Sequence, residues 1–218
     1  MPLQMPLRFE IQVNKCALLV FDMAKDFVAP GGVYELPGAR DIVPNLQSLI
    51  GFCRTNDIPI MYTQYIVRED LSNIGIIGEI WPEIKPLVQQ RRGFIKGAEG
   101  IEVYDPIKPE PQDTIIQKTR YSAFAHTDLE LVLKGKNRDT LIVTGVSTNI
   151  GPETTVRDAV LKDYKVVFVS DCTANNDIPD MGWGKIPAEL AKRVSFSVLA
   201  QAFCRVMTSK ELINELSQ

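Results

Sequence analysis

The chain lacks the features that mark several well-known classes of protein. Its four cysteines, Cys16, Cys53, Cys172 and Cys204, lie far apart and form no CxxC pair. This spacing excludes a cysteine metal knuckle and a disulfide scaffold. There is no excess of positive charge, since 24 basic residues face 27 acidic ones and the net charge is −3. Nucleic acid or an anionic membrane surface is therefore not expected as the main partner.

Long apolar segments are also missing. No apolar run approaches the roughly 18 to 20 residues of a membrane span, and residues 1–10 contain no apolar core of signal-peptide length. We therefore expect a cytoplasmic protein with no membrane partner. The 218 residues, of which 45% are hydrophobic, suit a single globular domain over residues 1–218.

Short apolar runs alternate with longer stretches of helical spacing. The run at 16–21 is almost wholly apolar, as in a strand covered on both faces, so Cys16 is expected to be buried and inert. This alternation predicts an α/β fold, a three-layer α-β-α arrangement with a mostly parallel, Rossmann-like sheet. Strands are expected at 16–21, 58–63, 114–117, 140–144 and 166–169, helices at 43–55, 128–133, 153–162 and 187–204, and a further helix after a cap at Thr208 or Ser209.

Two long stretches, residues 68–111 and 175–187, do not follow the alternation and are rich in glycine and proline. Long irregular loops in a compact domain often act as lids or binding loops. A contact between subunits explains them equally well, and the sequence leaves both explanations open.

Polar residues that directly follow expected strands are the first candidates for a functional site. In a parallel sheet the ligand lies beyond the carboxyl ends of the strands. Asp22 follows the first strand and Lys118 follows the third. We expect this carboxylate and this amine, at the ends of neighbouring buried strands, to meet in one crevice. They could form a catalytic pair or a plain ion pair.

The linker at residues 145–153 joins a strand to a helix, and Pro152 suits the first helical turn. Backbone N–H groups at such a helix start can bind an anion or an oxyanion. Capping by the side chain of Thr148 or Asn149 is the simpler interpretation, and the two can coexist.

Several blocks of the sequence resemble the signature blocks of the isochorismatase-like (cysteine hydrolase) superfamily. They occur in the family order, and the likeness runs from about Lys15 to Met207. The resemblance implies the three-layer α-β-α fold, a hydrolase without a cofactor, and a homo-oligomer, either a dimer or a tetramer. The blocks are Phe21-Asp-Met-Ala-Lys-Asp-Phe27, Lys118-Thr-Arg-Tyr-Ser-Ala-Phe124, the stretch from Thr144 to Ala159, and Ser170-Asp-Cys-Thr-Ala174.

The usual mechanism of this family is amide hydrolysis through an Asp-Lys-Cys set. Asp22 and Lys118 match the first two members, but the cysteine position falls on Gly151. The resemblance therefore predicts a member without the cysteine nucleophile, and thiol-based amidase chemistry is not expected. Nor is a metal site, because residues 63–68 lack the histidine that metal-binding relatives carry after the second strand, and the chain's one histidine, His126, lies elsewhere.

Glycine at this position resembles the true isochorismatases, which hydrolyse a vinyl ether and release pyruvate without a covalent nucleophile. By this resemblance Asp22 is the general acid, which requires that burial or shared hydrogen bonds favour its protonated form. Lys118 would position Asp22 or bind a substrate carboxylate. The leading hypothesis is a cofactor-independent hydrolase acting on a small, carboxylated molecule, with isochorismate-type ether hydrolysis as its most concrete form.

The resemblance also suggests residues that contact the substrate. Two of them depart from the isochorismatase pattern: Ser147 stands where an aromatic residue is usual, and Gln64 is displaced by one position. The Val146–Ser147 peptide is expected to be cis, as is common in this family. The substrate-binding candidates are Phe27, Gln64, Trp81, Tyr121, Ser147, Thr148 and Ile150.

Three other interpretations compete with this hypothesis. Ser147 could replace the missing thiol, but no adjacent histidine is present to activate it. The chain could be a non-catalytic member that binds a ligand or a protein partner. A dinucleotide-binding oxidoreductase is the most distant of the three, because no GxGxxG follows the first strand.

Overall fold

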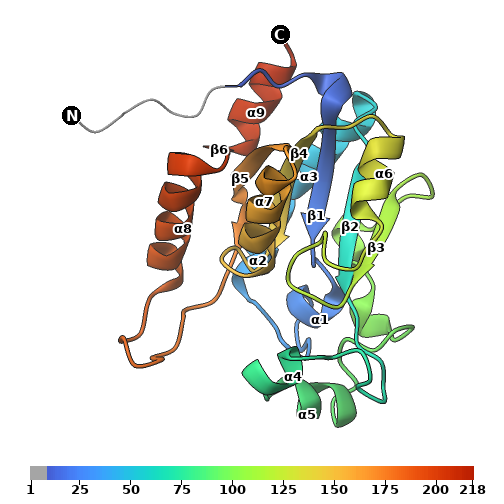
Figure 1. Ribbon diagram of the computed structural model, residues 1–218, viewed down its shortest axis with the longest axis vertical. Helices are drawn as coiled ribbons and strands as arrows, with labels where there is room; N and C mark the ends of the chain where they lie inside the picture. The colour runs from blue at the N-terminus through green and yellow to red at the C-terminus, as the bar shows by residue number, and fades with distance from the viewer. Residues whose placement is uncertain (1–8) are drawn as a thin grey trace.

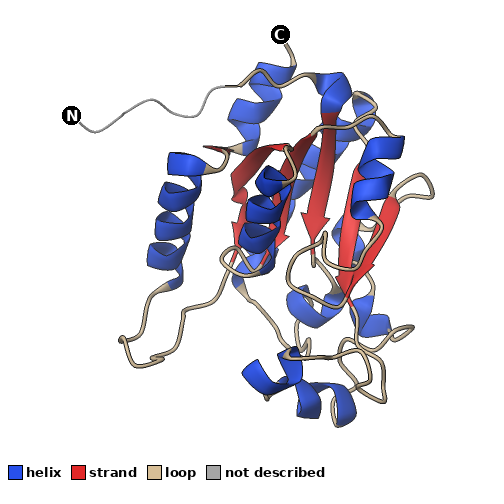
Figure 2. Ribbon diagram, viewed as in Figure 1, coloured by secondary structure: helices blue, strands red, loops and turns tan. Residues whose placement is uncertain are grey.

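Six parallel strands form one sheet in the order β3-β2-β1-β4-β5-β6. The computed structural model describes residues 9–218, and most of the N-terminal segment considered for a signal peptide lies outside the described residues. Helices cover both faces of the sheet (Figure 1, Figure 2). The predicted three-layer α/β fold is confirmed. The strands are β1 Cys16–Phe21, β2 Ile60–Tyr65, β3 Thr114–Lys118, β4 Thr140–Val146, β5 Lys165–Ala174 and β6 Arg205–Met207.

Most of the helices form two layers, one on each face of the sheet, and the remaining helices and the 3-10 turns are short. α3, α9 and the short α2 lie on one face of the sheet, while α6, α7 and α8 cover the other (Figure 1). The helices are α1 Lys25–Val28, α2 Gly38–Asp41, α3 Val43–Thr55, α4 Ile77–Ile80, α5 Ile84–Gln89, α6 Leu129–Gly135, α7 Gly151–Leu161, α8 Ala188–Ala202 and α9 Ser209–Leu216, with 3-10 turns η1 Val13–Lys15, η2 Glu99–Ile101 and η3 Asp105–Ile107.

The apolar run of β1 explains why the sheet is covered on both faces. Successive side chains of a strand point to opposite faces. Leu18 and Val20 therefore join the core under α3 and α9, while Leu19 and Phe21 join the core under α6, α7 and α8. All six residues of β1 are buried, as expected for a central parallel strand.

The order of the strands fixes the place of the site. The chain passes from β1 outward through β2 to β3, and then returns to pair β4 with the other side of β1. The connections therefore diverge at the carboxyl ends of β1 and β4, and such a switch point leaves a crevice for a ligand.

The five main strands and the longer helices agree with the sequence, whereas the short helices and the strand β6 were missed. The predicted helix at 43–55 coincides with α3, and the strand predicted at 166–169 is longer, Lys165–Ala174. The short helices α1, α2, α4 and α5 and the three-residue strand β6 are too short to show a period. Residues 68–111 are consequently more ordered than expected, since they contain α4, α5, η2 and η3.

Several smaller predictions are also confirmed. Cys16 is buried, as expected, and so are the other three cysteines, Cys53, Cys172 and Cys204. Thr208 caps α9 in a reciprocal capping box with Glu211. Apart from these predictions, none of the helices in residues 9–218 combines the length and the apolar composition that a bilayer-spanning helix needs.

Candidate active site

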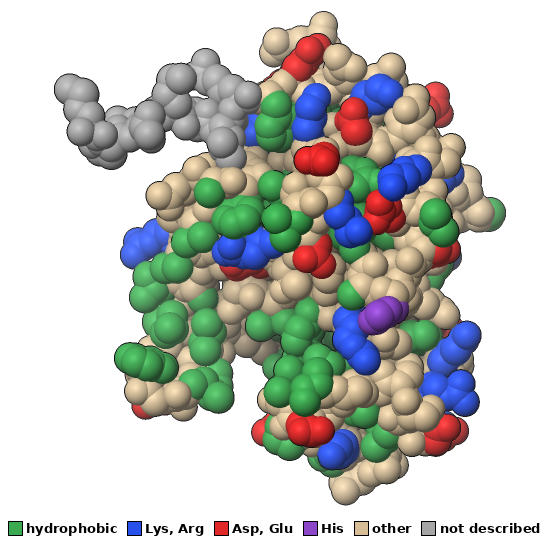
Figure 3. Space-filling view, in the orientation of Figure 1, with side chains coloured by type: hydrophobic (Ala, Val, Ile, Leu, Met, Phe, Trp, Pro, Cys, Tyr) green, Lys and Arg blue, Asp and Glu red, His purple; other side chains and the backbone are tan. Residues whose placement is uncertain are grey.

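A cavity of about 460 Å³ opens at the carboxyl ends of β1 and β4. In the space-filling view, hydrophobic side chains gather on both sides of a hollow between the loop below α8 and the lobe that carries α4 and α5 (Figure 3). The residues that line the cavity are Asp22, Phe27, Tyr34, Leu36, Tyr65, Ile80, Trp81, Lys118, Tyr121, Val146, Ser147, Asn149, Ile150, Gly151, Asn176, Asp177, Ile178 and Pro179.

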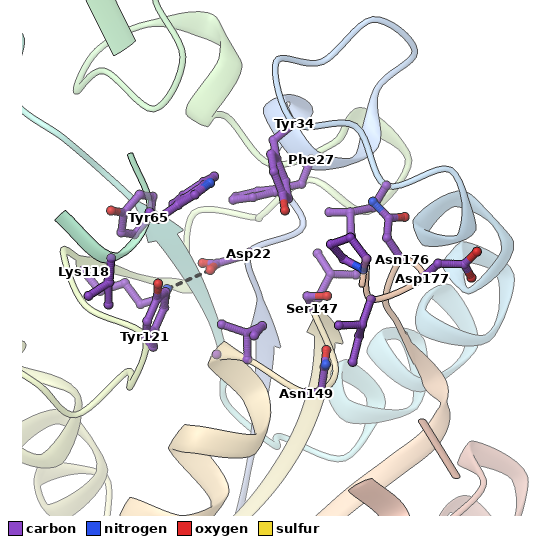
Figure 4. Close-up of a pocket in the computed structure, with 18 residues that line it drawn as sticks. Asp22, Phe27, Tyr34, Tyr65, Lys118, Tyr121, Ser147, Asn149, Asn176 and Asp177 are labelled. Atoms are coloured by element: carbon purple, nitrogen blue, oxygen red, sulfur yellow. Dashed lines mark ion pairs between the residues drawn. The ribbon is translucent and has the colours of Figure 1, made fainter. Parts of the chain in front are cut away.

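Asp22 and Lys118 form a buried ion pair at one side of this cavity. The Nζ atom of Lys118 lies 2.7 Å from Oδ2 of Asp22, and their side chains are 2% and 8% exposed respectively. The close-up shows the pair beside Tyr121, with Ser147 across the cavity (Figure 4). The expected meeting of the two residues in one crevice is confirmed.

The two residues do not end neighbouring strands, however, and this part of the prediction was wrong. Lys118 is the last residue of β3, and β2 lies between β3 and β1. Strands are spaced about 4.8 Å apart, so the long lysine side chain has to cross β2 to reach Asp22. β2 supplies a further contact that the sequence analysis missed, because the Thr63 hydroxyl donates a hydrogen bond to Oδ1 of Asp22 at 2.6 Å.

The surroundings of Lys118 are mostly apolar. Its Nζ lies 4.4 Å from the centre of the Phe21 ring and 5.2 Å from the centre of the Tyr65 ring, and it donates to the carbonyl of Arg120 at 3.3 Å. Burial lowers the pKa of Lys118, although the Asp22 carboxylate opposes that shift. Lys118 therefore releases its proton more easily than an exposed lysine does.

Asp22 lies at the point where the chain leaves the sheet. Its backbone is left-handed, with φ of 48°, a conformation that aspartate adopts more readily than most residues. The Asp22 amide donates to the Thr63 hydroxyl at 2.9 Å. Two hydrogen bonds to one threonine thus fix both the backbone and the carboxylate of Asp22.

The start of α7 forms the opposite wall. Ile150 occupies the N-cap position and Pro152 the first turn, as expected for Pro152, but no side chain caps the helix. The capping expected from Thr148 or Asn149 was therefore wrong. The backbone N–H groups of Asn149 and Gly151 form no hydrogen bond with another residue in the described part of the chain, so they are available to a ligand.

Eight of the ten predicted site residues line the cavity, and two do not. Thr148 is fully buried and its hydroxyl pairs with that of Thr173 at 2.9 Å. Gln64 donates to the carbonyl of Ile101 at 2.9 Å. Because side chains alternate along a strand, Gln64 points away from the face that Thr63 and Tyr65 share.

Aromatic side chains make up much of the remaining wall. Tyr34 packs edge-on against Trp81 at 5.1 Å and against Phe27 at 6.1 Å between ring centres. Burial raises the pKa of Tyr34, Tyr65 and Tyr121 above the ordinary tyrosine value of 10.0, so their hydroxyls remain hydrogen-bond donors even in alkaline solution. Tyr65 could have been found from the sequence, because it ends β2 as Asp22 follows β1. Tyr34 lies in a loop without a recognisable pattern.

Both long loops contribute to the cavity. Residues 68–111 supply Ile80 and Trp81, and residues 175–187 supply the stretch from Asn176 to Pro179. The interpretation of these loops as binding loops is thus supported for the parts that face the cavity. A role in subunit contacts, like the predicted homo-oligomer itself, stays a prediction.

No cysteine takes part in this site. None of the four lines the cavity, and burial raises the pKa of Cys16, Cys53 and Cys204 to about 12. His126 is exposed and does not line it either. Within residues 9–218, no group of three or more His, Cys, Asp or Glu side chains is arranged to hold a metal ion. The Val146–Ser147 peptide at the cavity wall is cis, as expected from the resemblance.

The chain is similar to several known proteins. It is 32% identical over 162 residues to enterobactin synthase component B of Escherichia coli K12, covering 74% of this chain and 53% of that protein. It thus spans about half the length of this relative. It is also 26% identical to the ureidoacrylate amidohydrolase RutB of Agrobacterium fabrum, over 75% of this chain and 77% of that one.

Solved structures and a family model extend this likeness to almost the whole chain. A cysteine hydrolase from Pseudomonas syringae pv. phaseolicola 1448A superposes with a TM-score of 0.92 at 33% identity, covering 99% of this chain and 98% of that one. The isochorismatase domain model matches residues 16–211. On this evidence, the chain belongs to the isochorismatase family.

Proposed function

We propose that this chain is a small-molecule hydrolase that uses water as its nucleophile, with Asp22 as the proton donor and acceptor and with no cofactor. Hydrolysis as the reaction type is supported by two of its relatives, a cysteine hydrolase and an amidohydrolase. The observation that carries the proposal is the buried Asp22–Lys118 pair, with its 2.7 Å contact, facing a cavity whose wall at Gly151 has no side chain.

The reaction that fits these groups best is hydrolysis of a vinyl ether. A proton passes from Asp22 to the terminal carbon of the double bond, which leaves an oxocarbenium ion. Water then adds to the cationic carbon and loses a proton to the Asp22 carboxylate. The resulting hemiketal breaks its bond to the ether oxygen, which gives a ketone and an alcohol. No step requires a covalent bond to the protein.

Lys118 supplies the proton that Asp22 passes on. Its burial lowers its pKa, so transfer across the 2.7 Å contact to Asp22 costs less than it would from an exposed lysine. Thr63 keeps the carboxylate in one orientation through its hydrogen bond to Oδ1. The buried Lys118 side chain, which is 2% exposed, also excludes water from that side of the pair.

The start of α7 is the place we assign to an anionic group of the substrate. Lys118 is already paired, and the one other charged side chain that lines the cavity within residues 9–218 is the carboxylate of Asp177. The N–H groups of Asn149 and Gly151 and the positive end of the α7 dipole favour an anion. A carboxylate, as expected for an isochorismate-type substrate, would bind there rather than at Lys118.

Ser147 is assigned to binding and not to nucleophilic attack. It lines the cavity across from Asp22 (Figure 4). Within the described residues, no histidine lines the cavity to act as its base, and an unactivated serine is a poor nucleophile.

The test is a coupled assay with isochorismate, in which lactate dehydrogenase reports released pyruvate. We expect the wild-type protein to release pyruvate and Asp22→Asn to lose at least about 100-fold in rate, because general acid catalysis contributes on that order. Gly51→Ala, a change on the exposed side of α3 where a Cβ meets nothing within 4 Å, is the control for handling and folding. Turnover that survives Asp22→Asn refutes the assignment of Asp22.

A second candidate function is a binding member of the family without catalysis, favoured by the missing side chain at Gly151. Calorimetry distinguishes it from the hydrolase. Binding of isochorismate without turnover of ether, ester or amide substrates supports the binding protein, and Asp22-dependent turnover of any of them excludes it.

A further inference from the structure

Phe21 fills the space that a side chain at position 151 would need. A Cβ atom built on Gly151 would lie 2.7 Å from Cζ of Phe21 and 3.2 Å from its Cδ1, and closer still to Cε1. Real Cβ atoms essentially never approach another heavy atom within 3.0 Å. Any residue larger than glycine at this position therefore has to displace the Phe21 ring.

The ring has little freedom to move. Phe21 is fully buried in the core between the sheet and α6, α7 and α8. Its backbone is paired with Gly145 on β4, where a Cβ would lie 2.6 Å from the Phe21 amide nitrogen. The backbones of β1 and β4 are thus in close contact at this point, so β1 has no room to move and the Phe21 ring stays beside Gly151.

The same ring touches the ion pair. The Nζ atom of Lys118 lies 4.4 Å from the centre of the Phe21 ring, and Asp22 is the next residue along the chain. The ring therefore lies between the start of α7 and the ion pair. A nucleophilic side chain on α7 would have to pass through the space that the ring occupies in order to reach Asp22.

We propose that Phe21 determines which nucleophile this site uses, because its ring occupies the volume beside Asp22 and Lys118 that a side chain at position 151 would fill. Water then remains as the nucleophile of this site. The inference deepens the proposed function, since it rests on Asp22 and Lys118 being the active pair. It predicts that Gly151→Cys alone does not produce a working thiol and that a smaller residue at position 21 permits one.

Alkylation by iodoacetamide tests this prediction without any substrate turnover. In the reaction, the thiol introduced at position 151 gives its proton to the Asp22 carboxylate, the thiolate sulfur bonds to the methylene carbon, and iodide leaves. The four native cysteines are buried, so mass spectrometry of the native protein detects the introduced thiol above a low background. The variants are Gly151→Cys, Phe21→Val/Gly151→Cys, Phe21→Val alone, and Gly51→Cys as an exposed reference thiol.

We expect Phe21→Val/Gly151→Cys to label with one equivalent at least about tenfold faster than Gly51→Cys near neutral pH, because a thiol beside a lysine is more fully ionised. Gly151→Cys alone should label more slowly than the double variant. The double variant should also release one equivalent of p-nitrophenolate in a burst from p-nitrophenyl acetate, as the thiolate forms an acetyl thioester. Phe21→Val alone should show neither reaction.

Thermal melting keeps the proposal testable if the double variant does not fold. Gly151→Ala should lower the melting temperature, whereas Gly51→Ala, in open space on α3, should not. Phe21→Leu/Gly151→Ala should recover part of the loss. The proposal is overturned if Gly151→Cys alone labels as fast as the double variant, or if Gly151→Ala melts like Gly51→Ala. An inactive wild-type protein would contradict the proposed function while leaving these comparisons intact.

Discussion

Removal of the negative charge of Asp22 should destabilise the protein in a manner that depends on pH. Asp22→Asn leaves Lys118, whose side chain is 2% exposed, as a buried cation without a counter-charge. Breaking such a pair from one side costs about 3–5 kcal/mol. That is a large part of the roughly 5–15 kcal/mol by which domains are stable.

The sign of the pH dependence follows from the pKa of Lys118. Burial lowers this pKa in the folded protein from the ordinary value of 10.5, and the loss of Asp22 lowers it further. Between the folded pKa and 10.5, the unfolded chain binds more protons than the folded one, so the free energy of unfolding rises with pH. Each further pKa unit by which the loss of Asp22 lowers the pKa of Lys118 adds about 1.36 kcal/mol to this increase in the free energy of unfolding. Asp22→Asn should therefore recover stability as the pH increases, more steeply than the wild type.

Urea unfolding followed by tryptophan fluorescence, at several pH values from about 7 to about 10, measures this effect. Asp22→Asn/Lys118→Met should recover most of the loss, because it removes both charges and methionine fills a similar volume. Asp177→Asn is the matched control, since Asp177 also lies 2.7 Å from a lysine, Lys185, but both side chains are largely exposed. Its stability should change little. If Asp22→Asn behaves like Asp177→Asn and shows no added pH dependence, the pair is solvated and the reasoning is wrong.

Two further predictions concern catalysis and the C-terminal helix. The rate of hydrolysis should fall on the alkaline side at a pH below 10.5, because burial lowers the pKa of Lys118 and the deprotonated amine cannot resupply Asp22. A pH–rate profile with an alkaline limb at or above 10.5 contradicts this role. Thr208→Ala should cost about 1 kcal/mol in urea unfolding by removing the cap of α9, while Thr208→Ser should keep most of the stability.

Much of the fold was predictable because it depends on local patterns. The continuous apolar run of β1 indicated a strand buried on both faces, and the helical spacing at 43–55 matches α3. The capping box of Thr208 and Glu211 is likewise a signal contained within four residues. Helices of four to six residues, such as α5, and the three-residue strand β6 carry too little periodicity to be recognised.

The sequence by itself determined that an acid and an amine belong to the site. Asp22 and Lys118 directly end or follow strands, and parallel strands bring their carboxyl ends to one edge, so an acid and an amine were expected there. The resemblance of the block around Gly151 to the isochorismatase-like family indicated that the nucleophilic cysteine is missing. The identities of Asp22 and Lys118 and their places after apolar runs are contained directly in the sequence.

Only the tertiary structure decided how these groups are arranged. It placed β2 between the two strands and brought Thr63 to the Asp22 carboxylate. It turned Gln64 toward Ile101, and it put the Phe21 ring against Gly151. Strand order and the direction of each side chain result from packing between segments far apart in the chain, and a local pattern contains no information about such distant partners.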